Sequence, residues 1–224
     1  MTIGAAAGVV LVACIALGIS AIFWRSHIDP DLLRSSQFRR IAHGMDWNYE
    51  SGDVFDYTAM TFATLDGRDG RASNVLLGVT RGGGPVCAFD YRCRADGHTT
   101  RYSCVLAELD TVLPHMLVEP DAAEVLRPSA DEDVVRRLDP VEGFPGLAVR
   151  SNDPDRVGSL LRRGTARWLV DRWPDAAFEV SGSLLVTFSP QVAPGEVGDL
   201  VRATDGLRRQ LDIDAHAADD PSTI

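Results

Sequence analysis

The chain has 224 residues, of which 45% are hydrophobic, and carries a formal net charge of −10 from 32 acidic and 22 basic side chains. Nucleic acid and anionic membranes are disfavoured as general partners, because both are polyanions. The length is enough for one domain with a sizeable hydrophobic core.

An uncharged apolar stretch opens the chain at residues 3–24 and reads IGAAAGVVLVACIALGISAIFW. A helix needs ~20 such residues to cross the hydrocarbon core of a bilayer. The stretch therefore predicts a transmembrane anchor over residues 1–24, with the lipid bilayer as partner. No basic residue precedes it, and Arg25, Arg34, Arg39 and Arg40 follow it. Positive charge favours the cytoplasmic side, so the N-terminus is predicted outside and the domain in the cytoplasm of a single-pass cell-membrane protein.

Other interpretations of this stretch remain open. A cleaved signal peptide normally has a basic start and a shorter apolar core, and neither feature is present. The tetrapeptide ending at Cys14 looks like a lipoprotein site, but the apolar run continues past it. Gly4 and Gly8 have the spacing of a helix-dimer contact, so a homodimer through the anchor is one possible partnership.

Residues 25–44 are predicted to form a juxtamembrane helix or linker. Asp29 fits the N-cap, Pro30 the first helical position and Gly44 the C′ position. A short strand is expected at 45–50. The clearest β region follows, with strands at 74–80, 86–94 and 101–109 joined by a glycine turn at 81–84 into an antiparallel meander. A further short strand is expected at 116–118.

The second half of the chain is expected to contain two amphipathic helices. After a strand at 144–149, a helix capped by Asp153 is predicted over residues 153–173, with Gly164 on its apolar face for close packing. A hairpin with strands 178–180 and 184–188 should turn at Ser181–Gly182, and the last helix should begin near Pro194. The predicted fold is α+β: a mainly antiparallel domain over residues 45–211, then an acidic disordered tail over 212–224.

Several segments together suggest a relative. They are MDWNYE, ASNVLLGVTRGGGPVCAFDYRC, RYSCVLAELDTVLPHMLVEP, FPGLAVRSNDPDRVGSLL and FEVSGSLLVTFSP. In this order after a single N-terminal span, they resemble an uncharacterised family of actinobacterial membrane-anchored proteins. The shared features are patterns of strands and not chemical signatures. The resemblance implies fold and lineage, and it implies no activity.

No catalytic, cofactor-binding or metal-binding residue is predicted. The sequence lacks a P-loop, a GxSxG nucleophile motif and HExxH spacing. The glycine turn at 82–84 joins two strands with no helix after it, which does not favour a phosphate site. Cys87, Cys93 and Cys104 lack CxxC spacing and fit a reducing compartment as small apolar residues. In an exported domain, Cys93 and Cys104 would be the pair to test for a disulfide.

One cationic feature gives a weak site hypothesis. Arg156, Arg163 and Arg167 fall on one side of the helix predicted over 153–173, where they could meet anionic lipids or an acidic partner. A solvated helix face paired with nearby acids explains the same pattern.

These observations favour a membrane-anchored cytoplasmic binding or scaffolding domain with a protein partner. Two alternatives are kept. A membrane-associated enzyme would need a deep pocket with titratable groups. An exported domain facing the cell wall would need the reversed topology.

Overall fold

The computed structural model describes residues 29–52, 54, 62–65, 70–95, 98–121, 135 and 137–219. The chain divides into two compact units, residues 1–37 and residues 38–224. The anchor predicted over residues 1–24 lies outside the described residues. Among the helices that are described, none combines the length and the apolar character that crossing a bilayer requires.

Helix α2 spans Pro30–Met45 and confirms the helix predicted in this part of the chain. In the first unit, Asp29 acts as the predicted N-cap, because its Oδ1 accepts a hydrogen bond of 2.9 Å from the backbone N–H of Asp31. In the second unit, the helix ends two residues later than predicted. Asp46, and not Gly44, takes the left-handed conformation with φ of 56°, and the N–H of Trp47 bonds to the carbonyl of Ala42 at 2.9 Å.

The described strands form one seven-stranded sheet in the order β1-β2-β3-β4-β6-β5, with β7 paired to β4. Strands β1 (Asn48–Glu50), β2 (Arg71–Val79) and β3 (Pro85–Ala95) lead into β4 (His98–Pro120). All of these pairs are antiparallel, which confirms the predicted meander. The turn between β2 and β3 is closed by the N–H of Thr80, which donates to the carbonyl of Gly84 at 2.9 Å.

The predicted hairpin at Ser181–Gly182 is wrong. Residues Ala177–Pro190 form one long strand, β7, which pairs along β4 from Tyr102 to Val118. Gly182 adopts φ of 64° opposite Leu113, at the point where the register shifts. The glycine therefore forms a bulge and not a turn, and β4 likewise continues through the region expected to separate two strands.

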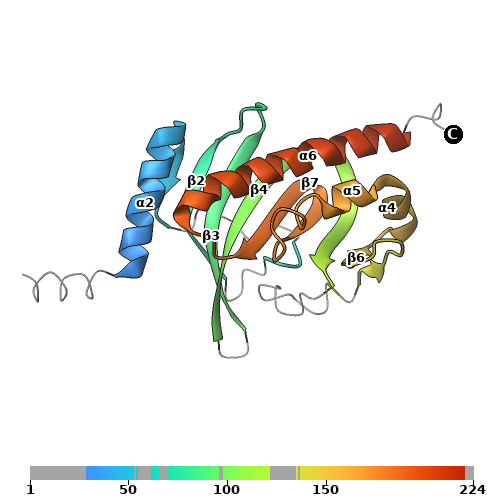
Figure 1. Cartoon of the computed structure of the whole chain (residues 1–224), viewed down its shortest axis with the longest axis horizontal. Coiled ribbons are helices and arrows are strands. Elements are labelled where there is room, and N and C mark those ends of the chain that lie inside the picture. The colour runs from blue at the N-terminus through green and yellow to red at the C-terminus, as the bar shows by residue number, and fades with distance from the viewer. Residues whose placement is uncertain are drawn as a thin grey trace, which may run out of the picture. The chain divides into compact units, whose positions relative to one another are not determined.

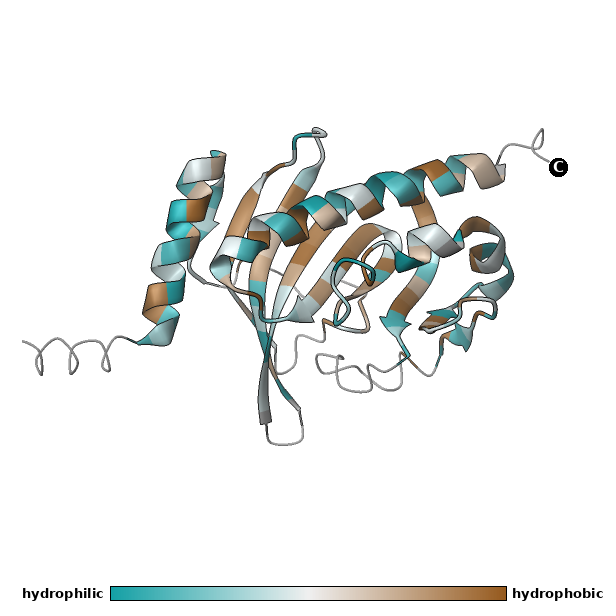
Figure 2. Cartoon of the chain, viewed as in Figure 1, coloured by the Kyte–Doolittle hydropathy of each residue, from teal (hydrophilic) through white to brown (hydrophobic). Residues whose placement is uncertain are grey.

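Helix α6 (Val197–Asp219) follows the short 3-10 helix η2 (Pro194–Glu196), so the predicted start near Pro194 is confirmed. It crosses one face of the sheet (Figure 1). The hydrophobic residues of α6 and of the strands below it form the larger core cluster (Figure 2). A second cluster covers the opposite face and includes the alternating residues Cys87, Phe89, Tyr91 and Cys93 of β3. Both faces of the sheet are thus apolar.

Two helix predictions need correction. Residues 153–173 contain two short helices, α4 (Pro154–Leu160) and α5 (Arg163–Arg167), and not one long helix. The chain is extended at Leu161, with ψ of 108°. The break brings the start of α5 to Asp214 of α6, whose carboxylate accepts a hydrogen bond of 2.6 Å from the Thr165 hydroxyl. The second correction concerns the tail: α6 continues to Asp219, so residues 212–219 are helical.

Two short strands complete the sheet beside the second half of β4. They are β6 (Leu147–Ser151), close to the strand expected at 144–149, and β5 (Asp139–Pro140). Strand β6 pairs with Met116–Pro120 of β4, and β5 pairs with β6.

Candidate functional site

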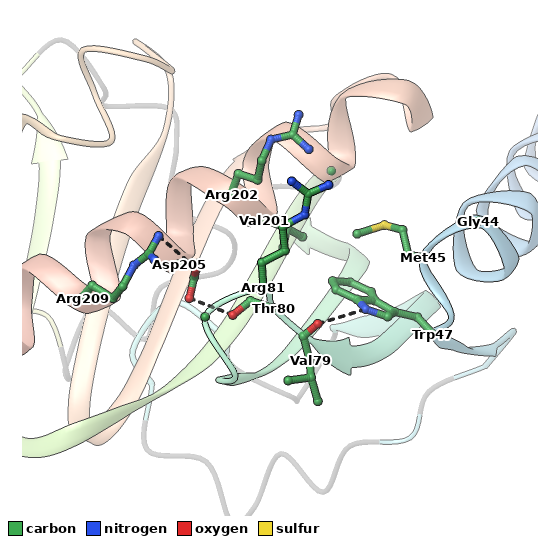
Figure 3. A pocket seen from close by; sticks show the side chains of 12 residues that line it. Gly44, Met45, Trp47, Val79, Thr80, Arg81, Val201, Arg202, Asp205 and Arg209 are labelled. Carbon is green, nitrogen blue, oxygen red and sulfur yellow. Dashed lines mark hydrogen bonds and ion pairs between the residues drawn. The ribbon is translucent and has the colours of Figure 1, made fainter.

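A groove of about 890 Å³ lies where three segments of the second unit meet. They are the end of α2 with the residues after it, the turn between β2 and β3, and the first half of α6 (Figure 3). From α6 come Gly198, Val201, Arg202, Asp205 and Arg209. Their spacing of one, three or four residues puts them on one side of the helix, and so α6 supplies one wall.

The opposite wall is mainly apolar. Trp47 packs flat against the backbone at Gly78, where an added Cβ would lie 2.2 Å from the indole ring. Its Nε1–H donates to the carbonyl of Val79 at 3.3 Å. Met45 and Val79 keep 37% and 57% of their surface exposed, although both are large hydrophobic residues. The ring of Trp47 is therefore held in place, and the exposed apolar atoms beside it are available for a ligand.

Three arginines and one aspartate give the groove its charge. Arg81 projects from the turn, and Arg202 and Arg209 project from α6 (Figure 3). Arg202 pairs with Asp199, and both side chains are more than half exposed, so this pair holds Arg202 weakly. Arg81 is exposed and makes no hydrogen bond or ion pair with any other described residue. Its guanidinium is free to meet an anion.

Asp205, the one acidic side chain among the described residues that line the groove, already bonds to other residues of the protein. Asp205 is buried, with 6% exposure. Its Oδ1 accepts hydrogen bonds from the Thr80 hydroxyl at 3.0 Å and from Nε of Arg208 at 3.4 Å. Its Oδ2 lies 3.1 Å from the guanidinium of Arg209. The carboxylate thus fixes the turn to α6, and the groove as a whole presents positive charge in a protein that is strongly acidic.

A buried polar seam behind the groove holds α6 on the sheet. Arg208 is 6% exposed and packs against the backbone at Gly84. It forms ion pairs with Asp205 and Asp212. Asp212 in turn accepts hydrogen bonds of 3.0 Å from the backbone N–H of Asp110 and from the Thr111 hydroxyl. These bonds position the wall of the groove that α6 provides.

The three predicted site arginines do not share one helix. Arg156 lies in α4, whereas Arg163 and Arg167 lie in α5. Arg167 is held by Asp171 at 3.2 Å and by the carbonyl of Pro145 at 3.2 Å. Neither Arg156 nor Arg167 is among the described residues that line the groove. The predicted helix-dimer contact at Gly4 and Gly8 lies outside the described residues and stays a prediction.

The cysteines lie in the sheet and not in the groove. Cys87, Cys93 and Cys104 are buried and free. Burial raises the pKa of Cys87 to about 12 and also raises the pKa values of Cys93 and Cys104. A raised pKa keeps the thiol neutral, and the thiolate is the nucleophile, so this environment opposes cysteine catalysis. Within the described residues, no three His, Cys, Asp or Glu side chains group closely enough to hold a metal ion.

Sequence reasoning missed the groove as a site. It noted the glycine turn and discounted it, because no helix follows the turn in the chain. In the structure a helix does lie beside the turn, but it is α6, more than a hundred residues later. The available signal was the combination of Arg81 with the methionine and tryptophan at positions 45 and 47, of which Met45 is exposed and Trp47 is half-buried. Nothing local in the sequence links those two segments.

Fold and groove together define a class: an α+β domain in which a long C-terminal helix crosses an antiparallel sheet and forms an amphipathic groove with the β2–β3 turn. The same fold occurs in the crystal structure of the mycobacterial trehalose monomycolate transport factor A, TtfA, with a TM-score of 0.62. The match covers 80% of this chain and 94% of that chain at 12% sequence identity. No protein-family model matches the chain. No curated protein sequence matches it either.

Proposed function

We propose that this protein is a membrane-anchored, non-catalytic binding domain that serves as an accessory factor in the transport of a lipid or glycolipid. The groove carries the proposal, since it joins a fixed aromatic wall to a set of guanidinium groups. Such a combination suits binding of an amphipathic ligand more than chemistry. The structural neighbour is a trehalose monomycolate transport factor, which supports the choice of transport.

The proposed arrangement in the cell is a single span over residues 3–24 with the domain on the cytoplasmic side. The arginines that follow the span support this orientation. The three free, buried thiols suit a reducing compartment. A Val112→Cys variant places a thiol at a position that is 71% exposed. In intact cells a membrane-impermeant maleimide should leave this thiol unlabelled, and should label it after the cells are opened. Labelling before opening would establish the exported topology.

The groove itself can be tested by photo-crosslinking in the native membrane. A benzophenone amino acid at Met45 would report on the groove, and the same residue at Val112 is the matched control, since both are exposed apolar positions and Val112 does not line the groove. We expect an adduct at position 45 and none at 112, measured as an increase in the intact mass of the purified chain. Equal adducts at both positions, or none, would refute the groove as the binding site.

A further inference from the structure

The groove separates its polar and apolar atoms in a way that specifies a class of ligand. Met45, Trp47 and Val79 provide apolar surface on the side formed by the residues after α2 and by β2. The guanidinium groups of Arg81 and Arg202 extend in the same direction from the turn and from α6 (Figure 3). A ligand that meets both parts needs an anionic end and an apolar length.

We propose that the groove binds an anionic membrane lipid, with the head group at Arg81 and Arg202 and an acyl chain along Met45, Trp47 and Val79. The inference rests on the proposed binding function and names the ligand class for the same groove. Guanidinium groups are suited to phosphate because they donate paired, charge-assisted hydrogen bonds. The third guanidinium, that of Arg209, is fixed by Asp205 and adds positive potential.

The balance of charge supports an anion. Among the described residues that line the groove, Arg81, Arg202 and Arg209 accompany one carboxylate, which is buried and bonded to Thr80 and two arginines. Asp199, which is not part of the lining, pairs with Arg202 at the exposed surface. The chain as a whole has a net charge of −10, so a local excess of guanidinium groups is not a consequence of composition. The local excess arises because the fold brings the turn and α6 together.

The size of the groove favours a lipid over an acidic segment of a protein. A volume of about 890 Å³ falls within the range of ~300–1,000 Å³ that is typical of small-molecule sites. A stable protein interface normally covers roughly 800 Å² on each partner. The predicted anchor would also keep the domain beside the cytoplasmic leaflet, which is rich in anionic lipids.

Lipid selectivity can be measured through the fluorescence of Trp47. The full chain is reconstituted in phosphatidylcholine vesicles that contain a brominated lipid. In one set the lipid with bromine on its acyl chain is phosphatidylglycerol, and in the other set it is phosphatidylcholine. A Trp47→Phe variant gives the emission of Trp24, Trp168 and Trp173, which is subtracted. We expect brominated phosphatidylglycerol to quench the Trp47 emission and brominated phosphatidylcholine to leave it nearly unchanged.

Variants identify the residues responsible. Arg81→Gln and Arg202→Gln should each raise about tenfold the lipid concentration needed for half of the quenching, because each removes a charged donor. Arg92→Gln, an exposed arginine of β3 outside the groove, should have no effect. If Trp47→Phe does not fold, a Met45→Trp variant provides a second reporter on the exposed rim, read as the quenching it gains over the unaltered chain.

The outcomes separate the lipid proposal from the binding function. Equal quenching by both lipids, or quenching that survives in Arg81→Gln and Arg202→Gln, would overturn the lipid proposal. Absence of quenching together with a polypeptide crosslinked at position 45 would also overturn it, and would leave the binding function standing with an acidic protein segment as the occupant. Absence of both quenching and crosslinking would refute the lipid proposal and the binding function together.

Discussion

The Nε2 atom of His115 lies 2.6 Å from Oε1 of Glu179, a carboxylate with no exposure to solvent. The same carboxylate accepts hydrogen bonds from the backbone N–H groups of Ala63 and Thr64, at 2.6 and 3.0 Å, and from the Thr64 hydroxyl. The Glu179 side chain of β7 thereby bonds both to β4 and to residues 63–64, which lie more than a hundred residues earlier in the chain. A fully bonded carboxylate of this kind has a structural role.

Replacing Glu179 should destabilise the protein. Glu179→Ala leaves several buried donors without an acceptor, and we expect a loss of roughly 3 kcal/mol in the free energy of unfolding. Urea denaturation measures the loss, and hydrogen exchange should show faster exchange at residues 62–65. Glu142→Ala removes an exposed glutamate and should change the stability by less than about 0.5 kcal/mol. Similar losses in the two variants would contradict the structural role of Glu179.

Two glycines should respond to alanine in opposite ways. A Cβ at Gly206 of α6 would lie 2.7 Å from the ring of Trp168, which is fixed by a hydrogen bond of 3.0 Å to the carbonyl of Ala203. Gly206→Ala should therefore cost about 1–3 kcal/mol through overpacking. Gly164 was predicted to allow close packing, but it is exposed and nothing lies within 4 Å of an added Cβ. Gly164→Ala should be neutral, or stabilising by up to ~1 kcal/mol. The midpoints of thermal unfolding of the two variants measure these changes in stability.

The three thiols of the sheet should resist modification in the folded protein. With a pKa of about 12, only about one Cys87 side chain in ten thousand is ionised at pH 8. In a Cys14→Ala background, Ellman's reagent should react slowly until urea is added, and then react with three thiols. The exposed thiol of a Val112→Cys variant is the positive control and should react at once. Rapid reaction of the native thiols would show that the sheet face is open.

Stability should fall in alkaline solution. The unfolded thiols ionise near their ordinary pKa of ~8.5, whereas burial keeps Cys87 and Cys104 neutral to much higher pH. Ionisation then favours the unfolded state, so the contribution of these groups is complete below about pH 8 and declines as the pH rises toward 12. Urea denaturation at pH 8 and pH 10 measures the slope. Cys87→Ala should reduce the difference between the two pH values even if it lowers stability at both.

The arginines of α4 and α5 provide a test of the groove against the earlier site hypothesis. Replacing Arg156, Arg163 and Arg167 together by glutamate should leave the quenching of Trp47 by brominated phosphatidylglycerol unchanged, because neither Arg156 nor Arg167 is among the described residues that line the groove. Arg167→Glu also removes contacts to Asp171 and Pro145, so circular dichroism must first confirm that the variant is folded. A loss of quenching equal to that of Arg81→Gln would show that the anion site lies on α4 and α5 and not in the groove.

Local patterns in the sequence predicted much of the sheet and the last helix. The apolar stripe of α6, which runs from Val197 through Leu200, Val201, Thr204 and Leu207 to Leu211, follows helical spacing in the sequence and is buried throughout. The period-two alternation in β3 likewise places Cys87, Phe89, Tyr91 and Cys93 on one face of the sheet. Such patterns can be read from the sequence because side-chain direction follows from the period of the helix or strand, which is a property of the chain itself.

Long-range contacts decided the rest. Ser181–Gly182 carries the same local signal for a turn and for a bulge, and only the pairing of β7 with β4 makes it a bulge. The long helix predicted over 153–173 breaks at Leu161, and Asp214 of α6 then accepts hydrogen bonds from the backbone N–H of Arg162 and from the Thr165 hydroxyl. The groove exists because α6 brings Arg202 and Arg209 to a turn made more than a hundred residues earlier. The sequence by itself thus determined which faces are apolar, and tertiary packing decided which polar groups meet, since those groups are far apart along the chain.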